Sequence, residues 1–382
     1  MSHSVTRELA GRELIIETGR LANQADGSVT VRYGDTVLLV TACISPTARE
    51  GVDFLPLTVD YEERMYAIGK IPGSFFRREG RPSQEGTLTA RLTDRCLRPL
   101  FPKTLHNEIQ VIVTILSVDQ ENDPSVLSIL GASAALSISN IPFDGPVAAT
   151  RMGYINNQLV INPTYDQLLE STLDLVVAGS KDAVVMIEAG SDEVSEEVIL
   201  EAVRLGQNTN ADLINIQQEL VAISGKDKME MASASDVDSG DVLLYHARNL
   251  FKDRLTPILF SGVEKGERDG SLDLAKQELE AYVGESFTSQ QISASFDTLV
   301  KSEVRSGILN QGKRPDGRTF TDIRPINCDV SILPRTHGTG LFSRGQTQIM
   351  TVATLGSMSD QQRLDTLSPG DTKRFMHHYN FP

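Results

Sequence analysis

The sequence predicts an α+β fold in which one α+β domain is present twice, an all-helical segment joins the two copies, and the second copy is truncated. Three observations support this. Short strands alternate with helices over residues 1–224, a helical pattern of apolar residues fills 242–308, and a glycine-containing hairpin recurs after residue 309. At about 100–200 residues per domain, the 382 residues have room for two or three domains, which excludes a small disulfide-stapled fold.

The first domain opens with a predicted hairpin, in which strands over 29–33 and 36–41 flank a Gly-Asp turn. A helix is predicted over 123–140, because an aspartate and a proline at its start suit an N-cap and a first turn. Small residues at 131–135 predict that this helix packs closely against a sheet. Further strands are expected over 109–118, 151–155, 158–161, 173–178 and 183–188, and a further helix over 192–222.

Residues 225–241 are rich in Ser and Asp and poor in large apolar side chains, which predicts a flexible linker. From 242 to 308 the large apolar residues recur at mixed spacings of three and four, which predicts an all-helical domain. The expected boundaries are therefore a first domain over 1–224, a linker over 225–241, a helical domain over 242–308 and the start of the second copy over 309–382.

The internal repeat is a hairpin that occurs twice without a gap. Gly27, Gly34, Thr36 and Ala42 in the first copy align with Gly338, Gly345, Thr347 and Ala353 in the second. Two hairpins with the same turn chemistry so far apart indicate a duplicated domain rather than a short repeat. After its hairpin the first copy continues for most of a domain, whereas the second soon reaches Pro382. We therefore expect the second copy to be incomplete and the chain to be the front of a longer protein.

The overall composition bounds the class of protein. No uncharged apolar run reaches the roughly 20 residues that span a bilayer, and the N-terminus lacks the apolar region of a secretory signal. We therefore expect no membrane partner and a cytoplasmic location. Cys43, Cys96 and Cys328 lie far apart without a C-x-x-C pair, which predicts structural thiols in a reducing compartment and no cysteine zinc site.

The net charge is −15, yet one segment is strongly basic. The segment from residue 64 to residue 103 contains three acidic and nine basic residues. The basic ones are Arg64, Lys70, Arg77, Arg78, Arg81, Arg91, Arg95, Arg98 and Lys103. A positive strip on an acidic protein predicts binding of nucleic acid at that place.

A glycine-flanked loop in this strip places two aromatic residues, Phe75 and Phe76, beside two arginines, Arg77 and Arg78. Aromatic rings stack on bases of any sequence, and guanidinium groups hold phosphates with two parallel hydrogen bonds. The loop therefore predicts a contact with single-stranded nucleic acid. The alternative is that the rings pack on a core and the arginines are merely solvated.

A helix predicted over 87–97 follows the loop. Arg91, Arg95 and Arg98 fall on one of its faces, where three like charges repel each other. An anionic ligand along this face would explain them. The alternative is that acidic groups elsewhere in the fold pair with them.

Two further motifs fall short of a binding site. Residues 307–313 match the G-x-x-x-x-G-K phosphate loop, but Arg314 and Pro315 follow where the motif needs Ser or Thr and a helix. His377 and His378 lack a further histidine or cysteine at ligand spacing, so no metal site is predicted there.

Several stretches carry a family resemblance: FLPLTVDY at 54–61, IPGSFFRREGRPS at 71–83, ARLTDRCLRPLFP at 90–102, RPDGR at 314–318 and LPRTHGTGLFSRGQTQ at 333–348. Together they resemble the polynucleotide phosphorylase family, which is related to the RNase PH phosphorolytic exonucleases. The resemblance implies two RNase PH-like domains joined by an all-helical domain, and a homotrimeric ring whose channel admits the 3′ ends of single-stranded RNA.

The activity that the resemblance implies is 3′-to-5′ phosphorolysis in mRNA degradation. Inorganic phosphate attacks the last phosphodiester with the help of magnesium, so that RNA(n+1) and phosphate give RNA(n) and a nucleoside diphosphate. The resemblance also allows for partners in an RNA-degradation complex. The alternative is an RNA-binding and assembly scaffold without chemistry of its own.

The implied site residues are those of an RNA channel. Phe75, Phe76, Arg77 and Arg78 correspond to RNA contacts, as do Arg91, Arg95 and Arg98. The catalytic residues and the magnesium ligands are expected downstream of Pro382, with none within 1–382. This chain is then expected to supply the RNA-channel surface and the ring scaffold, and to be inactive by itself.

Overall fold

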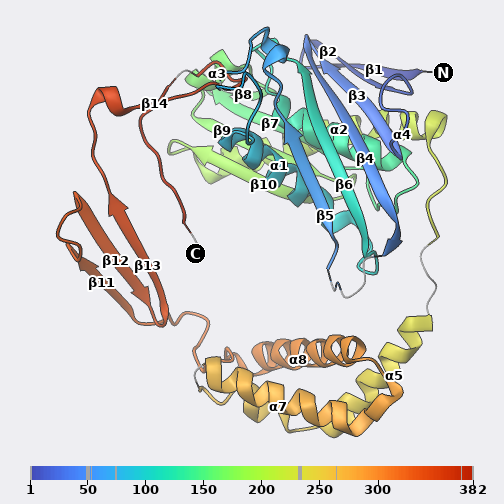
Figure 1. The fold of residues 1–382 in the computed structure, drawn as a ribbon, viewed down its shortest axis with the longest axis vertical. Coiled ribbons are helices and arrows are strands. Elements are labelled where there is room, and N and C mark those ends of the chain that lie inside the picture. The colour runs from blue at the N-terminus through green and yellow to red at the C-terminus, as the bar shows by residue number, and fades with distance from the viewer. Residues whose placement is uncertain are drawn as a thin grey trace. The chain divides into compact units, whose positions relative to one another are not determined.

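The computed structural model describes residues 2–48, 52, 54–73, 75–230, 235–263, 265–370 and 372–380, and at 235–241, 265 and 285 it describes the backbone alone. The chain divides into two compact units (Figure 1). The first unit joins Met1–Met231 to Gln362–Pro382, and the second is Ala232–Gln361.

A six-stranded sheet forms one layer of the first unit, in the order β1-β2-β3-β4-β6-β5. Only β5 and β6 are parallel, and the other neighbours are antiparallel. The predicted hairpin is the β3–β4 pair, with Gly34 in the left-handed region at φ +61°. The strands are β1 (His3–Leu9), β2 (Arg12–Thr18), β3 (Gly27–Tyr33), β4 (Thr36–Ala48), β5 (Leu57–Glu62) and β6 (Asn107–Ser117).

A four-stranded antiparallel sheet forms the other layer, in the order β10-β9-β7-β8. Its hairpins confirm the two strand pairs predicted over 151–161 and 173–188. A short helix, α3 (Tyr165–Glu170), connects β8 to β9. The strands are β7 (Ala148–Ile155), β8 (Gln158–Ile161), β9 (Leu173–Gly179) and β10 (Val184–Ser191).

The helix α2 (Pro124–Ile138) lies in the core of this unit, where it packs against β3 and β4 of one sheet and β7 of the other. All of its residues except Ser125 are buried. Close packing explains its small residues, because a Cβ on Gly131 would lie 2.6 Å from Val40. Likewise, a Cβ on Gly27 of β3 would lie 2.1 Å from the Ala135 carbonyl oxygen. The tight helix–sheet contact predicted from the sequence is confirmed.

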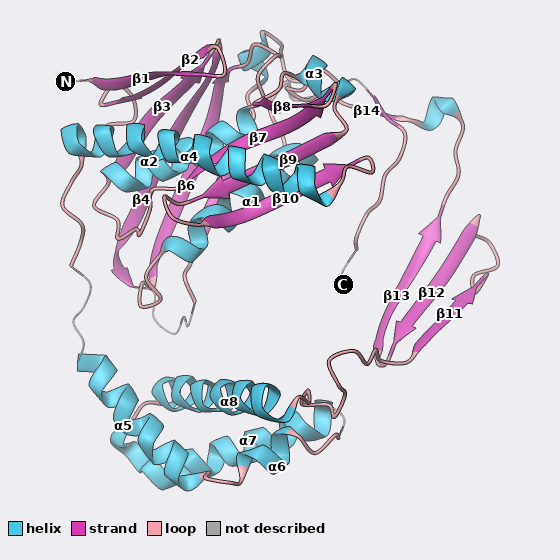
Figure 2. Ribbon diagram, turned by 180° about the vertical axis from the view of Figure 1, so that it is seen from behind, coloured by secondary structure: helices cyan, strands magenta, loops and turns pink. Residues whose placement is uncertain are grey.

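Two other helices complete the first unit. The helix α1 (Gln84–Leu97) packs on β5. The helix α4 (Glu196–Ser224) packs on β7 and β9 (Figure 2). Ser83 and Ser195 cap their N-termini, each accepting a hydrogen bond from the backbone N–H three residues on. Within the described residues, no helix is long and apolar enough to cross a membrane.

The second unit contains the predicted all-helical region, followed by a three-stranded antiparallel sheet. Its helices are α5 (Ser235–Leu250), α6 (Leu255–Leu259), α7 (Lys265–Val283) and α8 (Ser289–Gln311). They enclose a core of their own, which includes Leu243, Phe251, Leu255, Leu279, Ile292, Phe296 and Leu299. The strands are β11 (Ile326–Val330), β12 (Gly338–Arg344) and β13 (Thr347–Ala353).

The repeated hairpin has the same register in both units. Gly27 pairs with Ala42 across β3–β4, and Gly338 pairs with Ala353 across β12–β13. The turn glycine of the second hairpin, Gly345, has φ +60°, within a degree of its counterpart in the first. The two hairpins differ in their surroundings, because β13 is exposed along its length whereas α2 covers β4.

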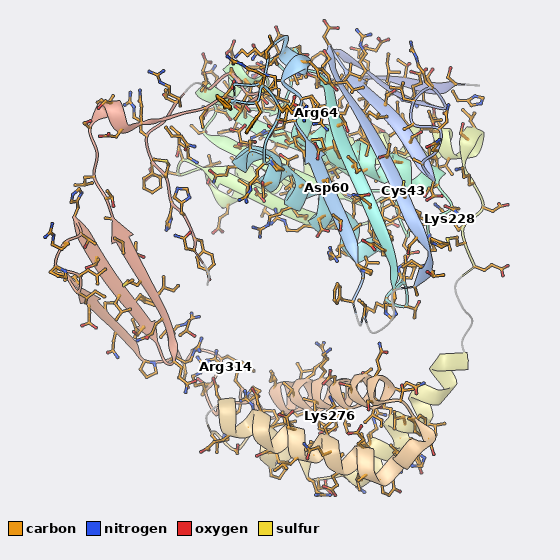
Figure 3. The ribbon with its side chains drawn as sticks, in the orientation of Figure 1. Cys43, Asp60, Arg64, Lys228, Lys276 and Arg314 are labelled. Atoms are coloured by element: carbon orange, nitrogen blue, oxygen red, sulfur yellow. The ribbon has the colours of Figure 1, made fainter. Side chains whose placement is uncertain are left out.

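Residues 225–241 were predicted to be a flexible linker, but the structure shows ordered contacts at the start of this range and a helix at its end. The backbone N–H groups of Lys226 and Met229 donate to carbonyls at the end of α2, at 3.0 and 2.8 Å. Lys228 Nζ (Figure 3) donates to three more carbonyls there, those of Leu136, Ser137 and Ser139. These groups satisfy carbonyls that a helix end leaves without partners. Helix α5 begins at Ser235, and residues 231–234 lie outside the described ranges.

Candidate RNA-binding surface

The loop predicted to contact RNA extends its two rings into solvent. Phe75 is 93% exposed and Phe76 is 78% exposed, with their ring centroids 5.3 Å apart in an edge-to-face arrangement. The alternative, that these rings pack on a core, is therefore wrong. Arg77 is also exposed and has φ +53°, a left-handed conformation that residues other than glycine rarely adopt. Backbone strain of this kind concentrates at ligand-binding sites.

The base of the loop is held by charged groups that follow β5. The Glu79 carboxylate accepts a hydrogen bond from the Met65 backbone N–H at 3.2 Å and lies 4.0 Å from the Arg64 guanidinium (Figure 3 labels Arg64). Arg64 also pairs with Glu62 at 3.0 Å. Hydrogen bonds from the backbone N–H groups of Glu79 itself and of Met65 lower the pKa of the Glu79 carboxyl. This carboxyl therefore stays ionised and keeps Arg64 close to the loop.

The far end of the loop leads into α1. Ser83 Oγ accepts from the Gly86 N–H at 2.9 Å, and the Ser83 N–H donates to Glu63 Oε2 at 3.1 Å. A Cβ on Gly86 would lie 2.8 Å from the same Glu63 oxygen, which explains the glycine in the first turn. The helix begins three residues before the predicted 87 because Ser83 is its N-cap.

A cavity of about 270 Å³ lies behind the loop. Its charged lining is of mixed sign and comprises Arg78, Arg81, Glu62, Glu63, Glu79 and Asp365. Four carboxylates among two arginines do not form a phosphate cradle. In the described ranges, no group of three or more His, Cys, Asp or Glu side chains is placed to hold a metal ion.

The three arginines predicted on one face of α1 have different surroundings. Arg91 is exposed and makes no hydrogen bond or ion pair with another described residue. Arg95 pairs with Glu188 of β10. Arg98 holds both oxygens of Asp94, at 2.7 and 2.9 Å, and donates to the carbonyls of Leu55 and Leu57. The structure thus favours pairing within the fold for Arg95 and Arg98, and leaves Arg91 available to a ligand.

A partly buried ionic cluster at the start of α2 was not predicted from the sequence. Asp123 accepts from the Ser125 N–H at 2.9 Å and pairs with the Arg151 guanidinium. Arg151 also holds both oxygens of Asp174, each at 2.6 Å. Burial acts to lower the pKa of Arg151, but Asp174 and Asp123 raise it well above its ordinary value. The N-cap signal at Asp123 was visible in the sequence, whereas the Arg151 pairing depends on the tertiary fold.

This cluster occupies a position that could otherwise bind an anion. The N-terminus of a helix favours anions because its N–H groups are free and its dipole is positive there. In α2 the carboxylate of Asp123 already takes this place, and the remaining cavity is about 10 Å³. A phosphate does not fit.

Comparison with known proteins places this fold in a class. The model of the 3′ exoribonuclease family, domain 1, matches residues 10–142, and the model of its domain 2 matches 145–209. The model described as polyribonucleotide nucleotidyltransferase, RNA binding domain, matches 243–319. The chain belongs to the 3′ exoribonuclease family, the RNase PH family.

Three relatives that match along the whole of this chain are proteins of one kind. Polyribonucleotide nucleotidyltransferases of Roseiflexus castenholzii, Herpetosiphon aurantiacus and Natranaerobius thermophilus are 50%, 51% and 47% identical to it over 100% of the chain. The chain spans about half the length of these relatives, from 49% to 54%. A crystal structure of rice (Oryza sativa) Rrp46 can be superposed on the chain with a TM-score of 0.45 and 14% sequence identity. The superposition covers 58% of this chain and 94% of the Rrp46 chain.

In the helical region that the third family model matches, no RNA contact was predicted from the sequence. One feature there was readable, a face of α8 on which Lys301 and Arg305 are exposed, four residues apart. They border a groove of about 360 Å³ whose other lining residues are Val300, Val304, Ile308 and Leu309. Basic and apolar residues at these spacings are the sequence pattern that distinguishes this face.

Proposed function

We propose that the chain is the RNA-holding part of a 3′-to-5′ phosphorolytic exoribonuclease. The reaction is RNA(n+1) plus inorganic phosphate to RNA(n) plus a nucleoside diphosphate. The observation that carries the proposal is the pair of solvent-exposed rings, Phe75 and Phe76, next to the arginines Arg77 and Arg78 in a chain of this family. Relatives named polyribonucleotide nucleotidyltransferase support the reaction.

The chemistry of this surface suits single-stranded RNA. The two rings would stack on bases without regard to sequence, and Arg77 and Arg78 would hold phosphates. Arg91, exposed on α1, extends the positive surface beyond the loop. Arg95 and Arg98 hold α1 to β10 and to the start of β5, and we propose a structural role for them.

We propose that the catalytic residues and the magnesium ligands lie downstream of Pro382, in the second RNase PH-like domain, with none within 1–382. The filled N-terminus of α2 supports this for the first domain, because it leaves no room for the attacking phosphate. No step of the reaction is therefore assigned to residues of this chain beyond binding and orienting RNA.

The assembly and setting of the intact protein follow from the same proposal. We propose a homotrimeric ring in the cytoplasm that degrades mRNA, with partners in an RNA-degradation complex. Light scattering on the intact protein tests the ring, because a trimer has three times the chain mass.

The second candidate is an RNA-binding and assembly scaffold without chemistry. The mixed-charge cavity behind the loop, which offers no phosphate cradle, favours it for the residues of this chain. Both candidates predict RNA binding, so the assay must measure product.

The experiment incubates the chain with oligoadenylate, inorganic phosphate and magnesium, and measures the ADP released. We expect binding of the oligonucleotide but no release of ADP by the chain alone. In the intact protein we expect release that depends on phosphate. If the chain alone releases ADP at the rate of the intact protein, catalytic residues lie within 1–382. If the intact protein releases no ADP, the RNA-binding scaffold is the correct candidate.

A further inference from the structure

One segment of the second copy belongs, in space, to the first unit. Gln362–Lys373, here called the returning segment, contains the two-residue strands β14 (Gln362–Arg363) and β15 (Thr372–Lys373), which pair with each other. Its Leu367 is 4% exposed and belongs to the hydrophobic core that β3, β4 and α2 share. A leucine buried in this way fixes the segment to the first unit with about 1.5–3 kcal/mol of burial.

The returning segment contacts the start of the RNA-binding loop. The Asp365 carboxylate lies over the Cα of Gly73, so closely that a Cβ on Gly73 would be 2.5 Å from Asp365 Oδ2. Gly73 has room for this contact because it lacks a side chain. Asp365 and Leu367 also line the cavity behind the loop, together with Arg78.

The same segment contacts the residues that immediately follow the loop. Ser368 Oγ donates to the Glu85 carboxylate, and Lys373 Nζ donates to Gln84 Oε1 at 2.8 Å. Gln84 and Glu85 form the first turn of α1, directly after its N-cap, Ser83. Both ends of the loop are thus in contact with one stretch of chain.

We propose that the returning segment positions the RNA-binding loop, with Leu367 as the anchor and Asp365 and Ser368 as the contacts that fix its two ends. The inference rests on the proposed RNA contact of Phe75–Arg78. A loop whose rings are in solvent has little packing of its own, so it would lose conformational freedom when RNA binds. Holding its ends in advance reduces that loss and strengthens binding. The second copy thereby sets the RNA affinity of the first.

The experiment compares Leu367→Ala with two reference variants in the chain. Leu367→Met keeps an apolar side chain of similar volume and should behave like the unaltered chain. Leu213→Ala removes an equally buried leucine of the same core from α4, away from the loop. Two quantities are measured on each: the rate of tryptic cleavage after Arg77 and Arg78, by mass spectrometry, and the Kd of fluorescein-labelled oligoadenylate, by anisotropy.

We expect Leu367→Ala to raise both the cleavage rate and the Kd by about tenfold, because a released loop opens more often and stacks less well. Leu213→Ala should lower Tm and leave both quantities unchanged. An unchanged cleavage rate in Leu367→Ala overturns the positioning role, as does faster cleavage with an unchanged Kd. If the unaltered chain binds no RNA, the proposed function fails, and cleavage alone decides whether the segment anchors the loop.

Discussion

The rings of Phe75 and Phe76 meet edge to face, with centroids 5.3 Å apart and planes at 83°. Neither ring is buried, so both are open to contact with a ligand. Two adjacent exposed rings form a contiguous apolar patch, and patches of this kind mark interaction sites. With Arg77 and Arg78 next in the sequence, the interaction that fits is the stacking of bases along a strand.

The arginines of the loop should govern the salt dependence of RNA binding. Arg77→Ala with Arg78→Ala should reduce the slope of log K against log salt by about 0.7 for each phosphate that the variant no longer binds. Binding of oligoadenylate at several salt concentrations measures this slope. Arg20→Ala removes an arginine that is 72% exposed on the same unit and should leave the slope unchanged.

The three cysteines should differ in reactivity. Cys96 is fully buried, and burial raises its pKa to about 12, whereas Cys43 and Cys328 are exposed. A thiol reacts as the thiolate, so Cys96 should be inert at pH 8 in the folded chain. Titration with Ellman's reagent should label Cys43 and Cys328 in buffer, and Cys96 as well in guanidinium chloride. Labelling of Cys96 in the folded chain would contradict its burial.

Asp119 should stabilise the first unit in a pH-dependent way. Burial acts to raise its pKa, but hydrogen bonds from Asn122, Glu121 and Thr36 lower it below that of an ordinary aspartate. A carboxyl with a lowered pKa contributes stability above its unfolded pKa of about 4, and loses that contribution as the pH falls through its folded pKa.

The test of this stabilisation is Asp119→Asn. The variant should melt at a lower temperature than the unaltered chain at pH 7, and the difference should narrow as the pH falls below about 4. Asp182→Asn changes an exposed aspartate without a hydrogen-bond partner among the described residues, and should leave Tm unchanged at both pH values. A difference that grows on acidification would be the wrong sign for this account.

Lys228 should stabilise the C-terminal end of α2. Its ammonium donates to three carbonyls at 2.8–3.0 Å, so Lys228→Ala removes three hydrogen bonds. Of these carbonyls, that of Leu136 alone keeps other donors among the described residues, the N–H and Oγ of Ser139. We expect a loss of about 1–3 kcal/mol in the free energy of unfolding, measured with urea. Lys181→Ala, on an exposed turn, is the matched control and should change little. Equal effects of the two substitutions would rule out the capping role.

The sequence predicted the elements whose signals are local. The β3–β4 hairpin followed from Gly34 in its turn, and α2 from Asp123 and Pro124 at its start, because these residues act on the backbone beside them. The repeat was detectable because both hairpins need the same glycine conformation. The linker over 225–241 was predicted from polarity alone. Polarity does not reveal that Lys228 reaches the end of α2.

The candidate site was predictable in its residues but not in their surroundings. The sequence does not show whether the rings of Phe75 and Phe76 are buried or exposed. Only the structure shows that they are exposed. Arg91 and Arg95 are equivalent by helical spacing, and only the position of Glu188 on β10 separates them. Leu367 lies in another repeat, so no local pattern connects it with the loop.

The measurement that tests the central claim most directly is the RNA affinity of the double variant Phe75→Ala with Phe76→Ala, together with its melting temperature. The account predicts that the Kd of oligoadenylate rises by about 5- to 150-fold for each base that no longer stacks. Tm should stay the same, because neither ring is part of the core. Phe320→Ala, which removes a ring that is 64% exposed elsewhere in the chain, should leave the Kd unchanged. An unchanged Kd in the double variant would contradict the assignment of this loop to RNA.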